Sequence, residues 1–158
     1  MVQISDYAAL ITNFGAKIGL DIRPTEEALQ VVLSVDSQDV GIDFDGSNNQ
    51  VVIFIEVGHL SARPSVEEYE RVCELNLGFL FQSRFGLGVN AETRAVVLVS
   101  RTPLGGLDAD GLVAAVENAI DKRSFCYSAL TARPSGPSAG PLTTDGALDD
   151  FRSFPLRV

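Results

Sequence analysis

Two runs of alternating apolar and polar residues, separated by a cluster of turn formers, constrain the fold most strongly. Val40, Ile42 and Phe44 alternate in the first run, and residues 51–57 alternate in the second. A period of two is typical of strands that bury one face. The sequence "DGSNN" at 45–49 joins the runs and is rich in residues that favour turns. This segment predicts an antiparallel hairpin, and with it a largely antiparallel sheet.

Other strands are expected on both sides of this hairpin. Residues 29–35 alternate in the same way and predict a preceding strand, although "TEEALQVV" could also extend as a helix from Thr25. The β-branched pair Val31 and Val32 favours the strand. Two further strands are predicted after the middle of the chain, at 87–90 and 94–101.

Three amphipathic helices complete the pattern. The first spans residues 5–18 and should end at Gly19, because glycine is favoured where a helix stops. The second runs from Ser65, which can form a capping box with Glu68, to about Gln82. The third begins near two aspartates that suit a helix N-terminus. It carries an apolar stripe made of Leu112, Val113, Val116, Ala119 and Ile120. The order helix, three strands, helix, two strands, helix predicts an α+β fold with helices flanking the sheet.

The composition changes at Ala132. Residues 1–132 suit one domain that can bury a core. Residues 133–158 begin with a stretch rich in Pro, Gly and Ser, which predicts a flexible tail. Its last eight residues, "FRSFPLRV", contain two phenylalanines and could dock, but a disordered tail is favoured.

Charge and hydropathy exclude several functions. The formal net charge is −9, and the acidic excess lies within residues 1–130. Such a domain is repelled by phosphate backbones and anionic bilayers, so nucleic-acid binding is not expected. No apolar run reaches the ~18 residues of a membrane helix, and the N-terminus lacks the basic region of a signal peptide. These features indicate a cytosolic protein without membrane insertion.

The cysteines and the single histidine suggest no chemistry. Cys73 and Cys126 lie in apolar periodic segments, which favours two buried free thiols over a disulfide. They have no metal-ligand spacing with each other or with His59. His59 is expected in a loop, where a structural role is favoured over a catalytic base because no nucleophile is spaced around it. Ser61 lies in no nucleophile-elbow pattern.

Two motif-like segments fail on context. "GLGVNA" at 86–91 matches a loose dinucleotide fingerprint, but a helix precedes it and a strand follows, which is the reverse of what that site needs. A calcium loop starting at Asp43 would require Gly at Asn48 and Glu at Phe54. We therefore expect no enzyme activity, no cofactor and no metal.

The second helix carries more apolar surface than one sheet can cover. On a helical wheel, one side holds Val66, Tyr69, Cys73, Asn76, Leu77 and Leu80. An adjoining strip holds Val72, Leu75 and Phe79, and together they cover roughly 200°, against ~100° for a helix packed on one layer. A further element of the chain or a second subunit must cover the rest, and a two-fold dimer is the natural inference.

The hairpin raises a similar question. Val52 and Phe54 are apolar but point to the face opposite Val51, Ile53 and Ile55. An antiparallel sheet with one solvated face should carry polar residues there. Either helices cover both faces in part, or the sheet presents an exposed apolar patch of the kind that marks binding sites. The pattern leaves both interpretations open.

Together these segments resemble the class I chaperones of type III secretion, the Tir-chaperone family. The resemblance covers about residues 3–128. It includes "FGAKIGLD" at the end of the first helix and "YERVCELNLGFLFQSRFGLGVNAETRAVVLVSRTPL" after the third strand. Its motifs are patterns rather than invariant signatures: the Leu75–Asn76 pair, Gly86 to Asn90, the paired strands, and Leu104 with Leu107. The tail after Ala132 departs from the compact family pattern.

The resemblance implies a homodimer of α-β-β-β-α-β-β-α subunits in the bacterial cytoplasm. Such a protein is a non-catalytic, ATP-independent chaperone that binds the N-terminal chaperone-binding segment of a secreted effector and keeps it soluble and competent for secretion. The matching dimer positions are Val72, Leu75, Phe79 and Val89. The matching client-binding positions are Leu10, Phe14, Val52 and Phe54. The alternatives are a regulatory or protein-binding domain of the same fold unrelated to secretion, and a small-ligand or enzyme domain.

Overall fold

Three helices and five strands follow one another in the predicted order. The computed structural model describes residues 4–25, 28–82 and 84–132, with the backbone only for residues 80–82. The elements are α1 (Ile4–Ile18), β1 (Val31–Val35), β2 (Gln38–Asp45), β3 (Gln50–His59), α2 (Val66–Gln82), β4 (Phe85–Val89), β5 (Ala95–Pro103) and α3 (Ala109–Thr131). Residues 31–35 form a strand, as the β-branched pair there predicted. The predicted tail, residues 133–158, lies outside the described residues.

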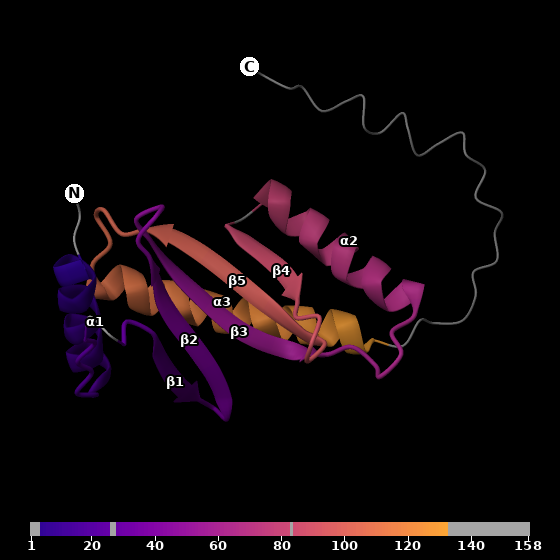
Figure 1. The fold of residues 1–158 in the computed structure, drawn as a ribbon, viewed down its shortest axis with the longest axis horizontal. Coiled ribbons are helices and arrows are strands. Elements are labelled where there is room, and N and C mark those ends of the chain that lie inside the picture. Colours follow the sequence, from indigo (N-terminus) through magenta and orange to yellow (C-terminus); the bar gives the residue numbers. More distant parts are fainter. Residues whose placement is uncertain (1–3, 26–27, 83, 133–158) are drawn as a thin grey trace, which may run out of the picture.

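The five strands form one antiparallel sheet in the order β1-β2-β3-β5-β4 (Figure 1). The predicted hairpin is confirmed, because Asp45 at the end of β2 pairs with Gln50 at the start of β3. Oδ1 of Asp45 accepts the main-chain N–H groups of Ser47 and Asn48 at 3.1 and 3.2 Å. The side-chain amide of Asn48 donates to the same carboxylate, and this hydrogen bond is the main cause that lowers the pKa of Asp45.

The helices are distributed unevenly around the sheet. In Figure 1, α3 runs behind the strands, α1 stands at the β1–β2 end, and α2 lies beside β4. The inward side chains of β3 are buried together with α1 and α3 residues in one core. The most deeply buried large side chains include Tyr7, Ile11, Phe14, Ile42, Ile53, Ile55, Leu98 and Leu112.

The helix ends follow the sequence signals. Gly19 has φ +78°, a conformation that L side chains rarely adopt, and Leu20 N–H donates to Gly15 O at 2.8 Å. At α2, Ser65 N–H donates to Glu68 Oε2 at 2.8 Å while Glu68 N–H donates to Ser65 Oγ at 3.3 Å. The predicted capping box is therefore confirmed.

The third helix is capped as its sequence suggested. Asp108 is the N-cap, and its Oδ1 accepts Gly111 N–H at 2.8 Å. This bond satisfies one of the main-chain donors that a helix N-terminus leaves without an intrahelical partner. Among the described helices, none is long and apolar enough to cross a membrane.

Two local expectations were wrong. Cys73 is exposed, although Cys126 is buried as expected, and both thiols are free. The reason is that α2 lies at the edge of the sheet, so one side of the helix has no packing partner in the described chain. His59 is the last residue of β3 rather than a loop residue, and its exposed Nδ1 lies 3.3 Å from Glu56 Oε1.

Candidate functional site

The sheet face opposite α3 carries a band of apolar side chains, which we call the outer sheet face. The register aligns Val32, Gly41, Phe54, Val99 and Gly86 across all five strands. The valines and Phe54 on this face keep some exposure, and Val32 is exposed most, whereas Gly41 is buried. Figure 1 looks onto this side, and no described helix crosses the strands in front. The outer sheet face comprises Val32, Val52, Phe54, Val97 and Val99.

Phe54 lies flat against the neighbouring strand because Gly41 has no side chain. A Cβ added to Gly41 would stand 2.1 Å from Cζ of Phe54, far inside van der Waals contact. The ring thereby buries the Gly41 backbone while its other surface stays partly exposed. A glycine opposite an aromatic residue is a known way of fixing such a pair across strands.

At its β4 end, the outer sheet face carries two glycines in place of larger residues. Gly86 and Gly88 of β4 pair with Val99 and Val97 of β5. A Cβ at Gly88 would meet nothing within 4 Å. The two valines therefore border an open surface at this side of the sheet.

The two edges of the sheet differ. At β4, Asn76 Oδ1 from α2 accepts the main-chain N–H of Leu87 at 3.0 Å, which satisfies a donor at that edge. At the opposite edge, β1 pairs with β2 and with no second strand among the described residues. An exposed strand edge can pair with a further strand from another chain. The open edge of β1 lies next to Val32, at the end of the outer sheet face.

The predicted client-binding residues fall into two groups. Val52 and Phe54 lie on the outer sheet face, as their alternation implied. Leu10 and Phe14 of α1 belong to the core, and Phe14 is only 1% exposed. For these two residues the client-binding assignment stays a prediction that rests on the resemblance alone.

Tyr7 accounts for the close packing of α1 against the sheet. Its hydroxyl donates to Leu29 O at 3.0 Å and lies 3.4 Å from Ile42 O, while its ring stacks on Phe44. Burial, and secondarily the charge of Asp43, raise the pKa of this phenol well above its usual value. Tyr7 therefore ties α1 to β2 and to the segment before β1.

The predicted dimer residues lie mostly on the packed side of α2. Val72 and Phe79 are buried, whereas Leu75 and Val89 are partly buried. The exposed side of α2 carries a different set, which we call the α2 stripe. The α2 stripe consists of Val66, Tyr69, Cys73 and Leu77. The wheel placed these residues in two apolar strips without assigning either one to the sheet, and the α2 stripe is the part that has no packing partner in the described chain.

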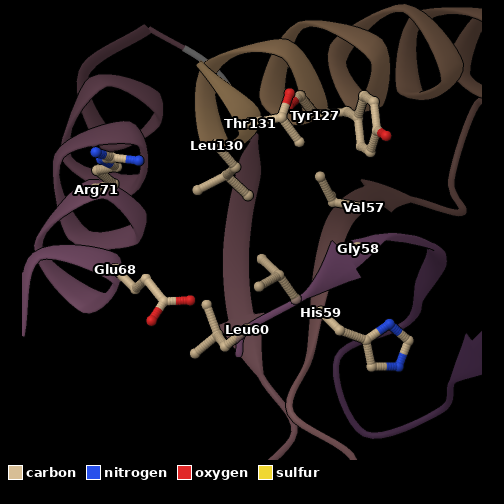
Figure 2. Close-up of a pocket in the computed structure, with 10 residues that line it drawn as sticks. Val57, Gly58, His59, Leu60, Glu68, Arg71, Tyr127, Leu130 and Thr131 are labelled. Atoms are coloured by element: carbon tan, nitrogen blue, oxygen red, sulfur yellow. The ribbon is translucent and has the colours of Figure 1, made fainter. Parts of the chain in front are cut away.

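A small pocket of about 140 Å³ lies where β3, α2 and α3 meet (Figure 2). Val57, Leu60 and Leu130 provide apolar walls, with polar groups of Glu68 and Arg71 at the rim. The Glu68 carboxylate already accepts hydrogen bonds from Ser61 and Ser65, and the main-chain N–H groups of these serines are the largest causes of its lowered pKa.

The polar groups around this pocket do not converge on one point. Figure 2 shows the His59 ring extending away from Glu68 and Arg71. The Arg71 guanidinium donates to Ala132 O at 3.4 Å. Within the described residues, no three His, Cys, Asp or Glu side chains are grouped to hold a metal ion. The pocket is therefore a small hollow with mixed apolar and polar walls.

Comparison with protein families identifies one to which this sequence is similar. The model of the Tir chaperone protein (CesT) family matches residues 9–126. No curated protein matches the chain.

Solved structures share the fold at low sequence identity. The crystal structure of the ExsC–ExsE complex contains a chain with a TM-score of 0.69 and 19% identity, and the match covers 89% of this chain and 100% of that one. A chain of the HopA1–SchA chaperone–effector complex matches with a TM-score of 0.66 and 12% sequence identity. The match covers 81% of this chain and 99% of that one. A chain of the heterodimeric ExoU–SpcU complex from the type III secretion system of Pseudomonas aeruginosa matches with a TM-score of 0.57 and 15% sequence identity. The match covers 77% of this chain and 98% of that one.

Proposed function

The chain belongs to the Tir chaperone protein (CesT) family, and from this membership we propose that it is a non-catalytic, ATP-independent chaperone of a type III secreted effector. It binds the N-terminal segment of the effector and keeps it soluble and competent for secretion. The structurally similar proteins include members of a chaperone–effector complex and of a type III secretion complex, which supports this partner class. The site of action is the bacterial cytoplasm.

The outer sheet face is the observation that carries the proposal. Five apolar side chains with residual exposure form a band beside the open edge of β1. A client in extended form can pair its main chain with an edge strand, while alternate side chains fill apolar positions. A disordered client loses entropy on ordering, so a long apolar band is what such a complex needs. Val52 and Phe54 are the central contacts in this proposal.

A second copy of the chain completes the proposed assembly through α2. The α2 stripe is an apolar surface without a partner in the described residues, and most soluble oligomers are two-fold dimers. Val89, which is partly buried, is the member of the predicted dimer set that remains within reach of a partner, whereas Leu75 lines a groove between α2 and α3. Val72 and Phe79 would support the interface from beneath.

Co-purification tests the proposal directly. The chain is co-expressed with the N-terminal segments of effectors encoded in neighbouring genes, and the complex is isolated through a tag on the effector. We expect a stable complex without added ATP, and a reduced yield for a Phe54→Ser variant. A chain that captures none of these segments, but co-purifies with a protein that is not secreted, would move the function to a regulatory domain of the same fold.

A further inference from the structure

A groove of about 500 Å³ lies between α2 and α3, on a different side of α2 from the α2 stripe. The rings of Phe79 and Phe85 line it with their centroids 6.1 Å apart. Phe125 also lines the groove and is 58% exposed, although its neighbour Cys126 is fully buried. The remaining lining residues are Glu74, Leu75, Gly78, Asn118 and Lys122. Three of the eight lining residues are phenylalanines, and the groove has a volume within the range of ligand-binding clefts.

The chain leaves α3 close to this groove. Ala132 is the C-cap of α3, and its carbonyl accepts a hydrogen bond from Arg71 of α2. Glu74 and Leu75 lie one helical turn after Arg71. Phe125 precedes Ala132 by two turns, or about 10 Å along the helix axis. A segment that follows residue 132 therefore starts about 10 Å along the helix axis from Phe125, the groove residue nearest to the end of α3.

We propose that residues 151–158, "FRSFPLRV", occupy the groove of their own chain. Phe151 and Phe154 would contact the aromatic lining, and Leu156 and Val158 extend the apolar surface. The connecting residues 133–150 are rich in Pro, Gly and Ser. For a chain of this length and composition the expected root-mean-square span is about 25 Å, more than twice the distance along α3 to Phe125.

Charge favours the same occupant. The segment contains two arginines and no acidic residue. On α2, four acidic residues stand against one basic residue, and on α3 three stand against two. Within the groove the charges of Glu74 and Lys122 balance, so the attraction comes from the acidic excess of the two helices as a whole. A basic apolar segment is therefore attracted to this pair of helices.

The shape of the groove separates this occupant from a second copy of the chain. A helix from a second subunit would pack on the convex, exposed α2 stripe, whereas a concave groove accepts protruding side chains. Attachment to the same chain also gives the segment an effective concentration in the millimolar range. An apolar peptide from another protein would then have to displace residues 151–158 before it could enter the groove.

A labelled peptide tests the proposal with full-length chains. Fluorescein-labelled FRSFPLRV is titrated by anisotropy against the wild-type chain and against a Phe151→Ser, Phe154→Ser double variant. We expect the double variant to bind the peptide at least ten-fold more tightly, because its own segment no longer competes. Adding Phe125→Ser to the double variant should abolish this binding. Adding Tyr127→Ser, at an exposed aromatic residue of α3 that lines the pocket of Figure 2 instead, should leave it intact.

Three results would overturn the proposal. The first is equal affinity of the wild-type chain and the double variant for the peptide. The second is equal loss of binding with Phe125→Ser and with Tyr127→Ser. The third is a double variant that sediments as a dimer and does not bind the peptide, which would assign the groove to a second copy.

Discussion

The ring of Phe54 occupies the space that a side chain at Gly41 would fill, with Cζ 2.1 Å from the position of the missing Cβ. The two residues are cross-strand neighbours on β2 and β3. The exposed aromatic surface at the centre of the outer sheet face thus depends on a glycine in the adjacent strand.

Gly41→Ala should therefore destabilise the protein and displace Phe54. Because the methyl group would overlap three ring atoms, the ring must rotate away, and we expect a loss of about 1–3 kcal/mol in the free energy of unfolding. Gly88→Ala is the matched control, since nothing lies within 4 Å of its added Cβ, and it should change stability by less than about 0.5 kcal/mol. Denaturant unfolding measures both. Equal effects of the two variants would show that the contact between Phe54 and Gly41 does not contribute to stability.

Two phenylalanines predicted to bind the client should respond differently to the same substitution. Phe54→Ser should leave the chain folded and weaken effector binding by about ten- to a hundred-fold, corresponding to roughly 1–3 kcal/mol per apolar anchor. Phe14→Ser should cost about 3–5 kcal/mol of folding stability, because that side chain is 1% exposed in the core. Circular dichroism melts combined with effector titration separate the outcomes. Normal effector affinity of a folded Phe54→Ser chain would remove Phe54 from the proposed client site.

Charged substitutions on α2 test the proposed dimer. Tyr69→Glu and Leu77→Glu alter exposed side chains, so the subunit should stay folded but sediment as a monomer. Phe79→Glu alters a buried side chain and should unfold or aggregate the chain instead. If the wild-type chain sediments as a monomer at ~100 μM, its dissociation constant exceeds that concentration. Such an association is weaker than a typical specific one, and this result would contradict the dimer.

The two cysteines should differ in reactivity. Cys73 is exposed, whereas burial raises the pKa of the Cys126 thiol to about 11. Because the thiolate is the reactive form, only about one Cys126 side chain in a thousand is ionised at pH 8. A thiol-specific reagent should modify one cysteine in the native chain and two after denaturation. Rapid modification of both in the native state would contradict the burial of Cys126.

The same pKa predicts a pH dependence of stability. Between the ordinary thiol pKa of 9.0 and about 11, the unfolded state loses the Cys126 proton while the folded state retains it. Stability falls wherever the unfolded state binds fewer protons, so the contribution of Cys126 should decrease across this range as pH rises. A Cys126→Ala chain should show a smaller decrease over the same interval in denaturant titrations.

Local signals predicted much of this fold. The turn formers at 45–49, the Ser65–Glu68 capping box and the stop at Gly19 each act within a few residues, and all three form as expected. Each depends on backbone conformation and short-range hydrogen bonds, which neighbouring residues determine.

The orientation of whole elements could not be predicted in this way. A helical wheel shows that α2 has two apolar strips but not which one faces the sheet, because that depends on where α2 lies relative to β4. Cys73 was misplaced for this reason. The hydrogen bond between Asn76 and Leu87 joins residues eleven positions apart, and nothing in the pattern around Asn76 indicated it.

That hydrogen bond also determines at which edge of the sheet a further strand can be added. With the Leu87 donor satisfied by Asn76, β4 is a poor template for an incoming strand, and β1 is the end at which pairing can continue. One subunit can therefore accept one added strand, which would make a six-stranded sheet with a defined end. Continued stacking of copies would need two open edges, so the Asn76 contact at β4 limits strand addition to the single open edge at β1.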